Sequence, residues 1–153
     1  MNQPHNPGRE GIHAFRDSDQ REPLRNDVSP FTVGLNMRIV SIDARAGRLR
    51  ATFDPGEHYI GGARPTVHGG AMATMLDISM ATLVVAMTGA DQRTATANLN
   101  VSFLRPLPPG PCTCEVEAER VGRTVAFMRA VLLDAAGERA ATGSATFPLF
   151  TAS

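Results

Sequence analysis

The chain has 153 residues, a formal net charge of zero and no lysine, so arginine supplies all of its basic side chains apart from histidine. This length suits one domain with a substantial hydrophobic core, and a zero net charge provides no long-range field that would attract nucleic acid or an anionic membrane surface. The amino terminus lacks the apolar stretch of a secretory signal, which makes a reducing, cytoplasmic setting the default expectation.

The first 29 residues are polar and rich in proline and glycine, so they can contribute little to a core. We expect residues 1–29 to form a flexible arm, in which a helix from about Asp17 to Leu24 could form, and residues 30–150 to form the domain. Order is expected to begin near Phe31. Apolar residues then alternate with polar ones before and after a turn at residues 43–47, which predicts a hairpin.

The next element is a long apolar helix from Ala71 to Met87, which is expected to stop near Gly89. Such a helix is buried on nearly all sides. Its length approaches that of a membrane span, but the central Asp77 argues against one. A carboxylate inside this helix costs several kcal/mol unless it has a partner or a function, so Asp77 is a candidate for chemistry. The alternative is a wet seam where Asp77 pairs with an arginine.

The helix is preceded by His68, Gly69 and Gly70. Two glycines allow a ligand to approach the backbone, and the first N–H groups of a helix have no partner within it. The helix start therefore predicts a binding site for a negatively charged or polarised oxygen. Alternatively, His68 simply caps the helix.

Beyond the helix the pattern has the period of a strand. Polar and apolar residues alternate from Thr94 to Phe103, and three more strands are expected at about 113–121, 124–133 and 139–147. Cys112 and Cys114 lie two apart, too far for an unstrained disulfide, and are expected to be core thiols. The histidines are scattered, so no metal site is predicted.

Two strands, one long helix and four further strands predict an α+β fold, because a helix that is apolar all round needs more cover than a flat sheet provides. A six-stranded, strongly curved antiparallel sheet wrapped around the helix satisfies this need.

Several motifs resemble one enzyme family. The segment from Val67 to Asp77 reads VHGGAMATMLD, and it is followed by NLNVSFLRP at residues 98–106, VGR at residues 121–123 and TGSATF at residues 142–147. This series resembles the hotdog-fold acyl-CoA thioesterases, in particular the branch named for phenylacetate degradation. The resemblance covers residues 31–147.

The resemblance implies a hotdog fold, a side-by-side homodimer, and hydrolysis of acyl-coenzyme A, with coenzyme A as part of the substrate and no other cofactor. By this resemblance Asp77 matches the catalytic carboxylate, which acts as general base or nucleophile. His68 and Gly69 match the helix start, where the Gly69 amide holds the thioester oxygen, and Thr96 matches a hydroxyl that positions water. Many members have asparagine where this chain has Gly62.

One chain cannot bring Gly69 and Asp77 to the same carbonyl, because the helix between them spans about 13 Å. A two-fold dimer with antiparallel helices would join the helix start of one subunit to Asp77 of the other. We therefore expect two composite sites per dimer, and two such dimers could pair into a homotetramer.

Arginines near loops are candidate anchors for the phosphates of coenzyme A, although each taken alone is more often a solvated surface residue. These candidates are Arg64, Arg105 and Arg123. Gly62 and Gly70 are expected to lie beside the substrate. The acyl pocket is expected to be lined by flexible side chains that core packing explains equally well. These are Met72, Met75, Leu76 and Met80.

Two other functions fit the sequence. A hydratase or dehydratase on the same scaffold would act on enoyl or hydroxyacyl thioesters, generally with a histidine and a carboxylate. A non-catalytic acyl-CoA binding module would use the same pocket without hydrolysis, and Gly62 in place of asparagine is the feature that supports it.

Overall fold

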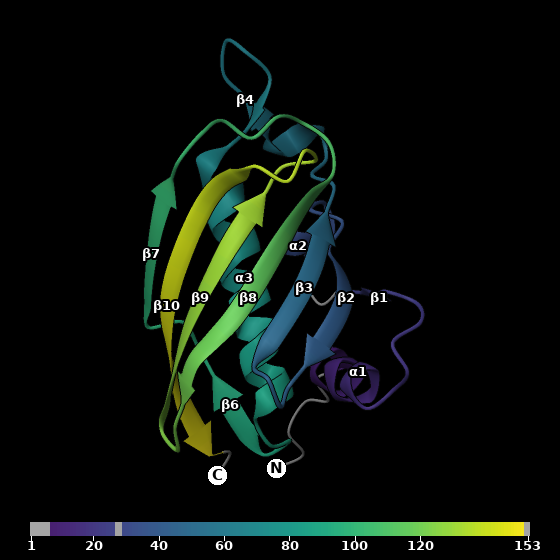
Figure 1. Cartoon of the computed structure of the whole chain (residues 1–153), viewed down its shortest axis with the longest axis vertical. Helices are drawn as coiled ribbons and strands as arrows, with labels where there is room; N and C mark the ends of the chain where they lie inside the picture. Colours follow the sequence, from purple (N-terminus) through teal and green to yellow (C-terminus); the bar gives the residue numbers. More distant parts are fainter. Residues whose placement is uncertain (1–6, 27–28, 152–153) are drawn as a thin grey trace.

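The structure, a computed structural model, describes residues 7–26 and 29–151. An antiparallel sheet of eight strands curls around one long helix (Figure 1). Its strands are β1 (Leu24–Arg25), β2 (Arg38–Asp43), β3 (Arg48–Phe53), β6 (Gln92–Thr94), β7 (Asn98–Phe103), β8 (Cys112–Val121), β9 (Val125–Leu133) and β10 (Arg139–Thr151). They follow the order β1-β2-β3-β8-β9-β10, and both β6 and β7 pair with β10.

Among the described residues, the remaining elements are three helices, one 3-10 turn and two short strands. The helices are α1 (Pro7–Arg16), α2 (Pro30–Val33) and α3 (Gly69–Met87), with a 3-10 turn at Glu57–Tyr59, and β4 (Ile60–Gly61) pairs with β5 (Thr66–Val67) in a separate two-stranded ribbon. This ribbon leads directly into the start of α3.

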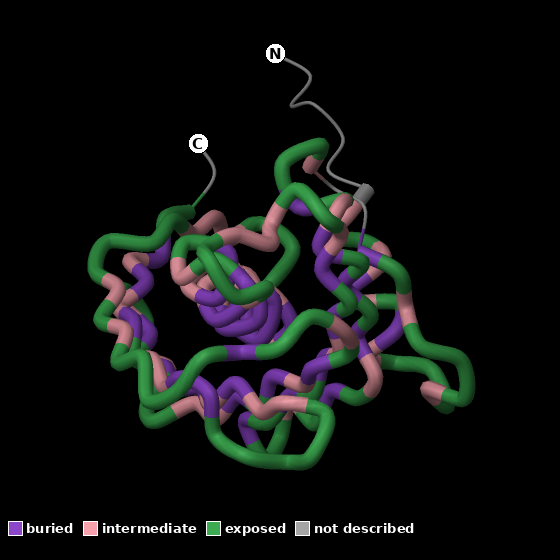
Figure 2. Tube along the Cα trace, turned by 90° about the horizontal axis from the view of Figure 1, so that it is seen from above, coloured by how far each residue is buried: buried purple, intermediate pink, exposed green. Residues whose placement is uncertain are grey.

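The central helix α3 fills the inside of the curled sheet (Figure 2). Met75, Leu76, Met80 and Leu83 have no solvent exposure. They pack against inward-facing side chains of the sheet such as Met128. The burial of this apolar surface stabilises the fold, because each such side chain contributes about 1.5–3 kcal/mol when it leaves water. The predicted architecture, a curved antiparallel sheet around a long helix, is confirmed.

The six expected strands correspond to β2, β3, β7, β8, β9 and β10, and the structure adds the short strands β1 and β6. The first expected strand begins later than predicted, because residues 30–33 form the helical turn α2, which Ser29 caps. The predicted strand from Thr94 to Phe103 is broken at residues 95–97, between β6 and β7.

The prediction of a helix from Asp17 to Leu24 is wrong, because the helix of this region is α1 at Pro7–Arg16. The expectation that residues 1–29 add little to the core is also wrong for Ile12 and Phe15, which are each 7% exposed and belong to the core. Residues 1–6 and 27–28 of the expected arm lie outside the described residues.

Within the described part of the chain, α3 is long and apolar enough to cross a membrane by length and composition alone, and 56% of that apolar window is buried inside the protein. Its apolar surface is thus used in packing against the sheet.

Candidate active site

Asp77 lies on the side of α3 that the sheet does not fully cover, where it is half-buried. The hydroxyl of Thr96 donates a hydrogen bond of 2.7 Å to Asp77 Oδ1. Thr96 belongs to the break between β6 and β7, so the irregular backbone at residues 95–97 brings this side chain to the helix. The structure therefore joins two of the predicted site residues through a direct contact.

The conformation at the start of α3 is fixed by the residue that caps it. His68 is the N-cap, and its Nδ1 accepts a hydrogen bond of 2.9 Å from the Gly70 N–H. The carbonyl of His68 accepts bonds from the N–H groups of Ala71 and Met72. Among the described residues no acceptor is recorded for the N–H of Gly69. This amide, at the positive end of the helix dipole, can donate to an oxygen of a ligand.

Neighbouring segments fix the position of this helix start. The N–H of His68 donates to the carbonyl of Tyr59 at 2.7 Å, and the N–H of Val67 donates to the carbonyl of Leu107. The ring of Phe103 packs against Gly69, at about 3.4 Å from where a Cβ would lie. The alternative that the sequence left open for His68, a capping role, is observed, and the cap fixes the backbone that carries the Gly69 amide.

Gly62 lies in an exposed loop and has a φ of 88°, which glycine adopts without strain. Arg64 is exposed in the same loop, and Gly70 is exposed in the first turn of α3. A glycine at position 62 therefore satisfies the backbone but presents no side chain to the site.

The three predicted arginine anchors do not meet within one chain. Arg64 and Arg105 lie at the end of the molecule where the β4–β5 loop and the segment after β7 are found, whereas Arg123 lies in the hairpin at the opposite end of β8 and β9 (Figure 1). Arg105 pairs with Glu138 at 3.0 Å on the surface.

The side chains expected to line an acyl pocket are in the core. Met72 is 3% exposed, and Met75, Leu76 and Met80 have no exposure. Neither cavity described below includes them. Core packing, the alternative that the sequence left open, accounts for their burial.

The thiols of Cys112 and Cys114 are also buried, as predicted. Burial raises the pKa of each thiol to about 12, so neither is a reactive thiolate near neutral pH. Within residues 7–26 and 29–151 no group of three histidine, cysteine or acidic side chains could hold a metal ion.

Two of the cavities lined by the described residues bear on the site. The larger, of about 620 Å³, lies on the outer face of the sheet and is walled by charged side chains that include Arg50, Glu115 and Arg129. The smaller, of about 160 Å³, lies between α1 and α3, and Ile78 in its wall is the residue after Asp77. The sequence did not predict this second cleft, because its outer wall comes from α1.

The comparisons with known proteins all point to one family, the thioesterases. A model of the thioesterase superfamily matches residues 65–141, a segment that contains α3 and the Thr96 region. A curated acyl-coenzyme A thioesterase THEM4 from Bos taurus is 45% identical over 78 residues, which are 51% of this chain and 30% of that protein. The mouse THEM4 is 26% identical over 94 residues, which are 61% of this chain and 39% of that protein. The match thus spans about a third of the length of these relatives.

Solved structures share most of the fold. A phenylacetic acid degradation-related protein from Ralstonia eutropha JMP134 has a TM-score of 0.74 and 31% identity, with 78% of this chain and 90% of that chain covered. A thioesterase protein from Streptococcus pneumoniae TIGR4, whose structure includes coenzyme A, has a TM-score of 0.68 and 17% identity over 76% of this chain and 88% of that chain. The second likeness concerns the fold alone.

Proposed function

Because the chain belongs to the thioesterase superfamily, we propose that it hydrolyses acyl-coenzyme A thioesters to a free acid and coenzyme A. The observation that carries this proposal is the hydrogen bond between Thr96 and Asp77 on the open side of α3. A half-buried carboxylate that is oriented by a hydroxyl is suited to hold or activate water. The names of the curated relatives support a thioester as substrate.

In the proposed reaction Asp77 Oδ1 is held by Thr96, which leaves Oδ2 to act on the substrate side. As a general base, Oδ2 accepts a proton from a water molecule while the water oxygen attacks the thioester carbonyl carbon. As a nucleophile, Oδ2 attacks that carbon itself and forms an anhydride, which water then hydrolyses. In both cases the C–S bond breaks, and the leaving thiolate of coenzyme A takes up a proton.

The amide of Gly69 is the proposed donor to the oxygen on which negative charge develops. Its N–H has no acceptor among the described residues, and the N-terminus of α3 adds a positive partial charge. The hydrogen bond from the Gly70 N–H to His68 keeps this helix start in one conformation. The donor is therefore oriented before the substrate arrives.

We propose that the site is shared by two copies of the chain. Gly69 and Asp77 lie on one helix more than two turns apart, so one carbonyl cannot contact both within a single chain. Strand β7 pairs with β10 on one side, and the described residues provide no strand for its other side. Edge strands with unpaired backbone groups are common sites of strand pairing between subunits, which supports a side-by-side homodimer.

The first test is hydrolysis by the wild type and by Asp77→Asn. We expect the wild type to release thiol from acyl-CoA substrates, as measured with a thiol reagent, and Asp77→Asn to lower kcat at least about a hundredfold with little change in KM, because the carboxylate acts in the transition state. An Asp77→Asn variant within about threefold of the wild type would refute the assignment. Asp91→Asn, an exposed carboxylate beyond the helix end, is the control.

A single-turnover reaction in water enriched in ¹⁸O then separates the two roles of Asp77. A general base delivers solvent ¹⁸O to the first acid released and leaves Asp77 unlabelled. A nucleophile whose anhydride is hydrolysed at the Asp77 carboxyl carbon instead releases an unlabelled acid and leaves ¹⁸O on Asp77, which mass spectrometry of the protein detects. Crotonyl-CoA serves as a further substrate. Loss of the conjugated double bond without thiol release would favour a hydratase, and binding of several acyl-CoAs without either change would favour a binding module.

A further inference from the structure

The cleft of about 160 Å³ between α1 and α3 has Ile78, the residue that follows Asp77, in its wall. Ala81 in its wall follows Asp77 by four residues, so it lies on a similar side of the helix about 6 Å further along. The cleft is lined by Gly8, Arg9, Ile12, Asn26, Ile78, Ala81, Thr82 and Val85. A group bound next to Asp77 can therefore extend into it along α3.

The lining of the cleft is mainly apolar. Ile12, Ile78, Ala81 and Val85 present hydrocarbon side chains. The hydroxyl of Thr82 donates to the carbonyl of Ile78 at 2.7 Å, so it is already satisfied within the helix. A cleft whose lining is mainly hydrocarbon suits a hydrocarbon ligand, because such a ligand needs no hydrogen bonds from its site.

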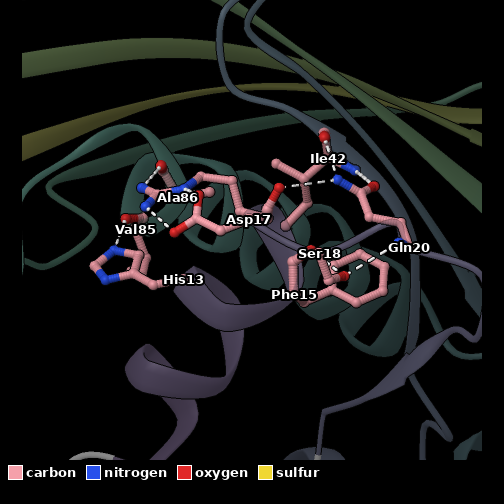
Figure 3. A network of polar contacts seen from close by, with 9 residues as sticks. His13, Phe15, Asp17, Ser18, Gln20, Ile42, Val85 and Ala86 are labelled. Atoms are coloured by element: carbon pink, nitrogen blue, oxygen red, sulfur yellow. Dashed lines mark hydrogen bonds and ion pairs between the residues drawn. The ribbon is translucent and has the colours of Figure 1, made fainter.

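The outer wall of the cleft is held in place by hydrogen bonds between α1 and the C-terminal end of α3. His13 Nε2 lies 2.8 Å from the carbonyl oxygen of Val85, and Arg16 donates to the carbonyl of Ala86 at 2.9 Å (Figure 3). Arg9 donates to the carbonyl of Gly89 at 3.2 Å. The carbonyls of Val85 and Ala86 belong to the last turn of α3, where carbonyls have no partner within the helix ladder. These contacts make α1 a fixed wall.

We propose that this cleft, on the α1 side of Asp77, receives the acyl group of the substrate and sets its size. This inference rests on the proposed thioester hydrolysis. An apolar cavity of about 150 Å³ holds a benzene ring, so the cleft suits one aromatic ring or a chain of about six carbons. Acyl groups of this class, such as phenylacetyl and hexanoyl, are the expected substrates, and Ala81 and Ile12 determine the fit.

The test replaces a small residue in the α3 wall of the cleft with a larger one that occupies the space. Ala81→Leu adds three carbons at a half-buried position and keeps a good helix former. We expect kcat/KM for phenylacetyl-CoA and hexanoyl-CoA to fall at least about tenfold, while acetyl-CoA, which does not reach into the cleft, changes less than about threefold. The matched control is Ala14→Leu, the same change at an exposed position of α1 outside the cleft.

A binding measurement makes the inference independent of turnover. Calorimetric titration of the wild type with the thioether hexyl-CoA and with coenzyme A gives the affinity that the hexyl group adds, and Ala81→Leu should remove most of this gain. Circular dichroism and thermal melting of each variant check that it is folded.

The outcomes separate the two proposals. Thiol release with equal effects of Ala81→Leu on all chain lengths would overturn the cleft as the acyl site and leave the hydrolysis intact. Absence of thiol release by the wild type would refute hydrolysis, and the titration would still decide the cleft, since an unchanged hexyl contribution in Ala81→Leu overturns it.

Discussion

Among single residues, Thr96 has the most direct link to Asp77. Its hydroxyl is the one protein donor recorded for that carboxylate among the described residues. A single hydrogen bond to a charged group contributes about 1.5–3 kcal/mol, and here its value lies in orientation, because it fixes which oxygen of Asp77 faces the substrate. We therefore regard Thr96 as a positioning residue.

Thr96→Val tests this role, because valine keeps the shape of threonine and removes the hydroxyl. We expect kcat to fall about tenfold or more with a small change in KM, since the loss of about 1.4 kcal/mol of transition-state stabilisation is tenfold in rate. Thr96→Ser retains the hydroxyl and should stay within about threefold of the wild type. Steady-state kinetics with one acyl-CoA provide the measurement, and equal losses in both variants would speak against the role.

Position 62 illustrates how the backbone limits what a site residue can do. Gly62 has a φ of 88°, and its Cβ, if present, would lie 3.4 Å from the carbonyl oxygen of Arg64. A side chain here would be strained by the backbone angle. The asparagine expected from the resemblance is thus replaced by the residue that this loop conformation favours, and the Thr96–Asp77 contact is made without it.

At the scale of elements, α1 depends on long polar side chains that reach the end of α3. Arg16 forms an ion pair with Asp17 at 2.7 Å and also donates to the carbonyl of Ala86. Arg21 forms a similar ion pair with Asp19 at 3.0 Å, but its side chain is 84% exposed. The two arginines thus differ in whether they connect α1 to α3.

Replacement of each arginine by methionine separates these contributions. Arg16→Met should lower the free energy of unfolding by about 1–2 kcal/mol, because it leaves a helix-end carbonyl without its donor. Arg21→Met should change it by less than about 0.5 kcal/mol, since exposed ion pairs contribute little. Urea denaturation of both variants checks the difference, and equal effects would contradict the proposed connection.

The free edge of β7 is a second feature at this scale. The N–H of Leu104 donates to the carbonyl of Ala140 on the β10 side. Because N–H directions alternate along an antiparallel strand, Ser102 and Asn100 face β10, and Val101 directs its N–H to the free edge. A proline at position 101 therefore removes an edge donor without breaking the pairing with β10.

Val101→Pro is expected to weaken the proposed dimer, whereas Val101→Ala, which keeps the N–H, is expected to preserve it. Light scattering coupled to size-exclusion chromatography reports the mass of each variant. A dimer of unchanged stability in Val101→Pro would show that β7 is not the pairing strand.

At the scale of the whole molecule, the proposed shared site predicts complementation between two inactive chains. Asp77→Ala lacks the carboxylate, and Gly69→Pro lacks the amide N–H at the first helical position, where proline is well accepted. When the two proteins are unfolded and refolded together, mixed dimers should contain one intact site, so about a quarter of the wild-type activity should return. Gly69→Ala, which keeps the N–H, is the control for the added side chain. No recovery would argue for a site within one chain.

The fold was predictable where one pattern ran over many residues. The apolar run of α3 and the alternation in the later strands identified the helix and its cover. The helix α1 was missed because Ile12 and Phe15 are its main buried apolar residues in a polar segment, and their burial depends on a partner far away in the sequence. The acyl cleft was missed for the same reason, since it exists only where α1 docks on α3.

The prediction of one continuous strand from Thr94 to Phe103 is wrong at residues 95–97, between β6 and β7. In one continuous strand Thr96 would face the same side as Asn98 and Asn100, away from α3. At the break, the N–H of Ala97 donates to the carbonyl of Thr146, and Asn98 is also paired with Thr146. Two consecutive residues thus lie opposite one, so the alternation of side chains shifts by one residue and Thr96 faces α3. The irregularity that sequence periodicity could not reveal is what brings Thr96 to Asp77.

The rigid separation of Gly69 and Asp77 on α3 has a consequence for how activity depends on protein concentration. No loop movement shortens the distance between two residues of one continuous helix, so a dissociated chain would not form the proposed shared site. On dilution below the dissociation constant of the proposed dimer, turnover per chain should therefore decline in proportion to the fraction still associated. The proposed shared site thus makes the proposed activity depend on the abundance of the protein, without a separate inhibitor.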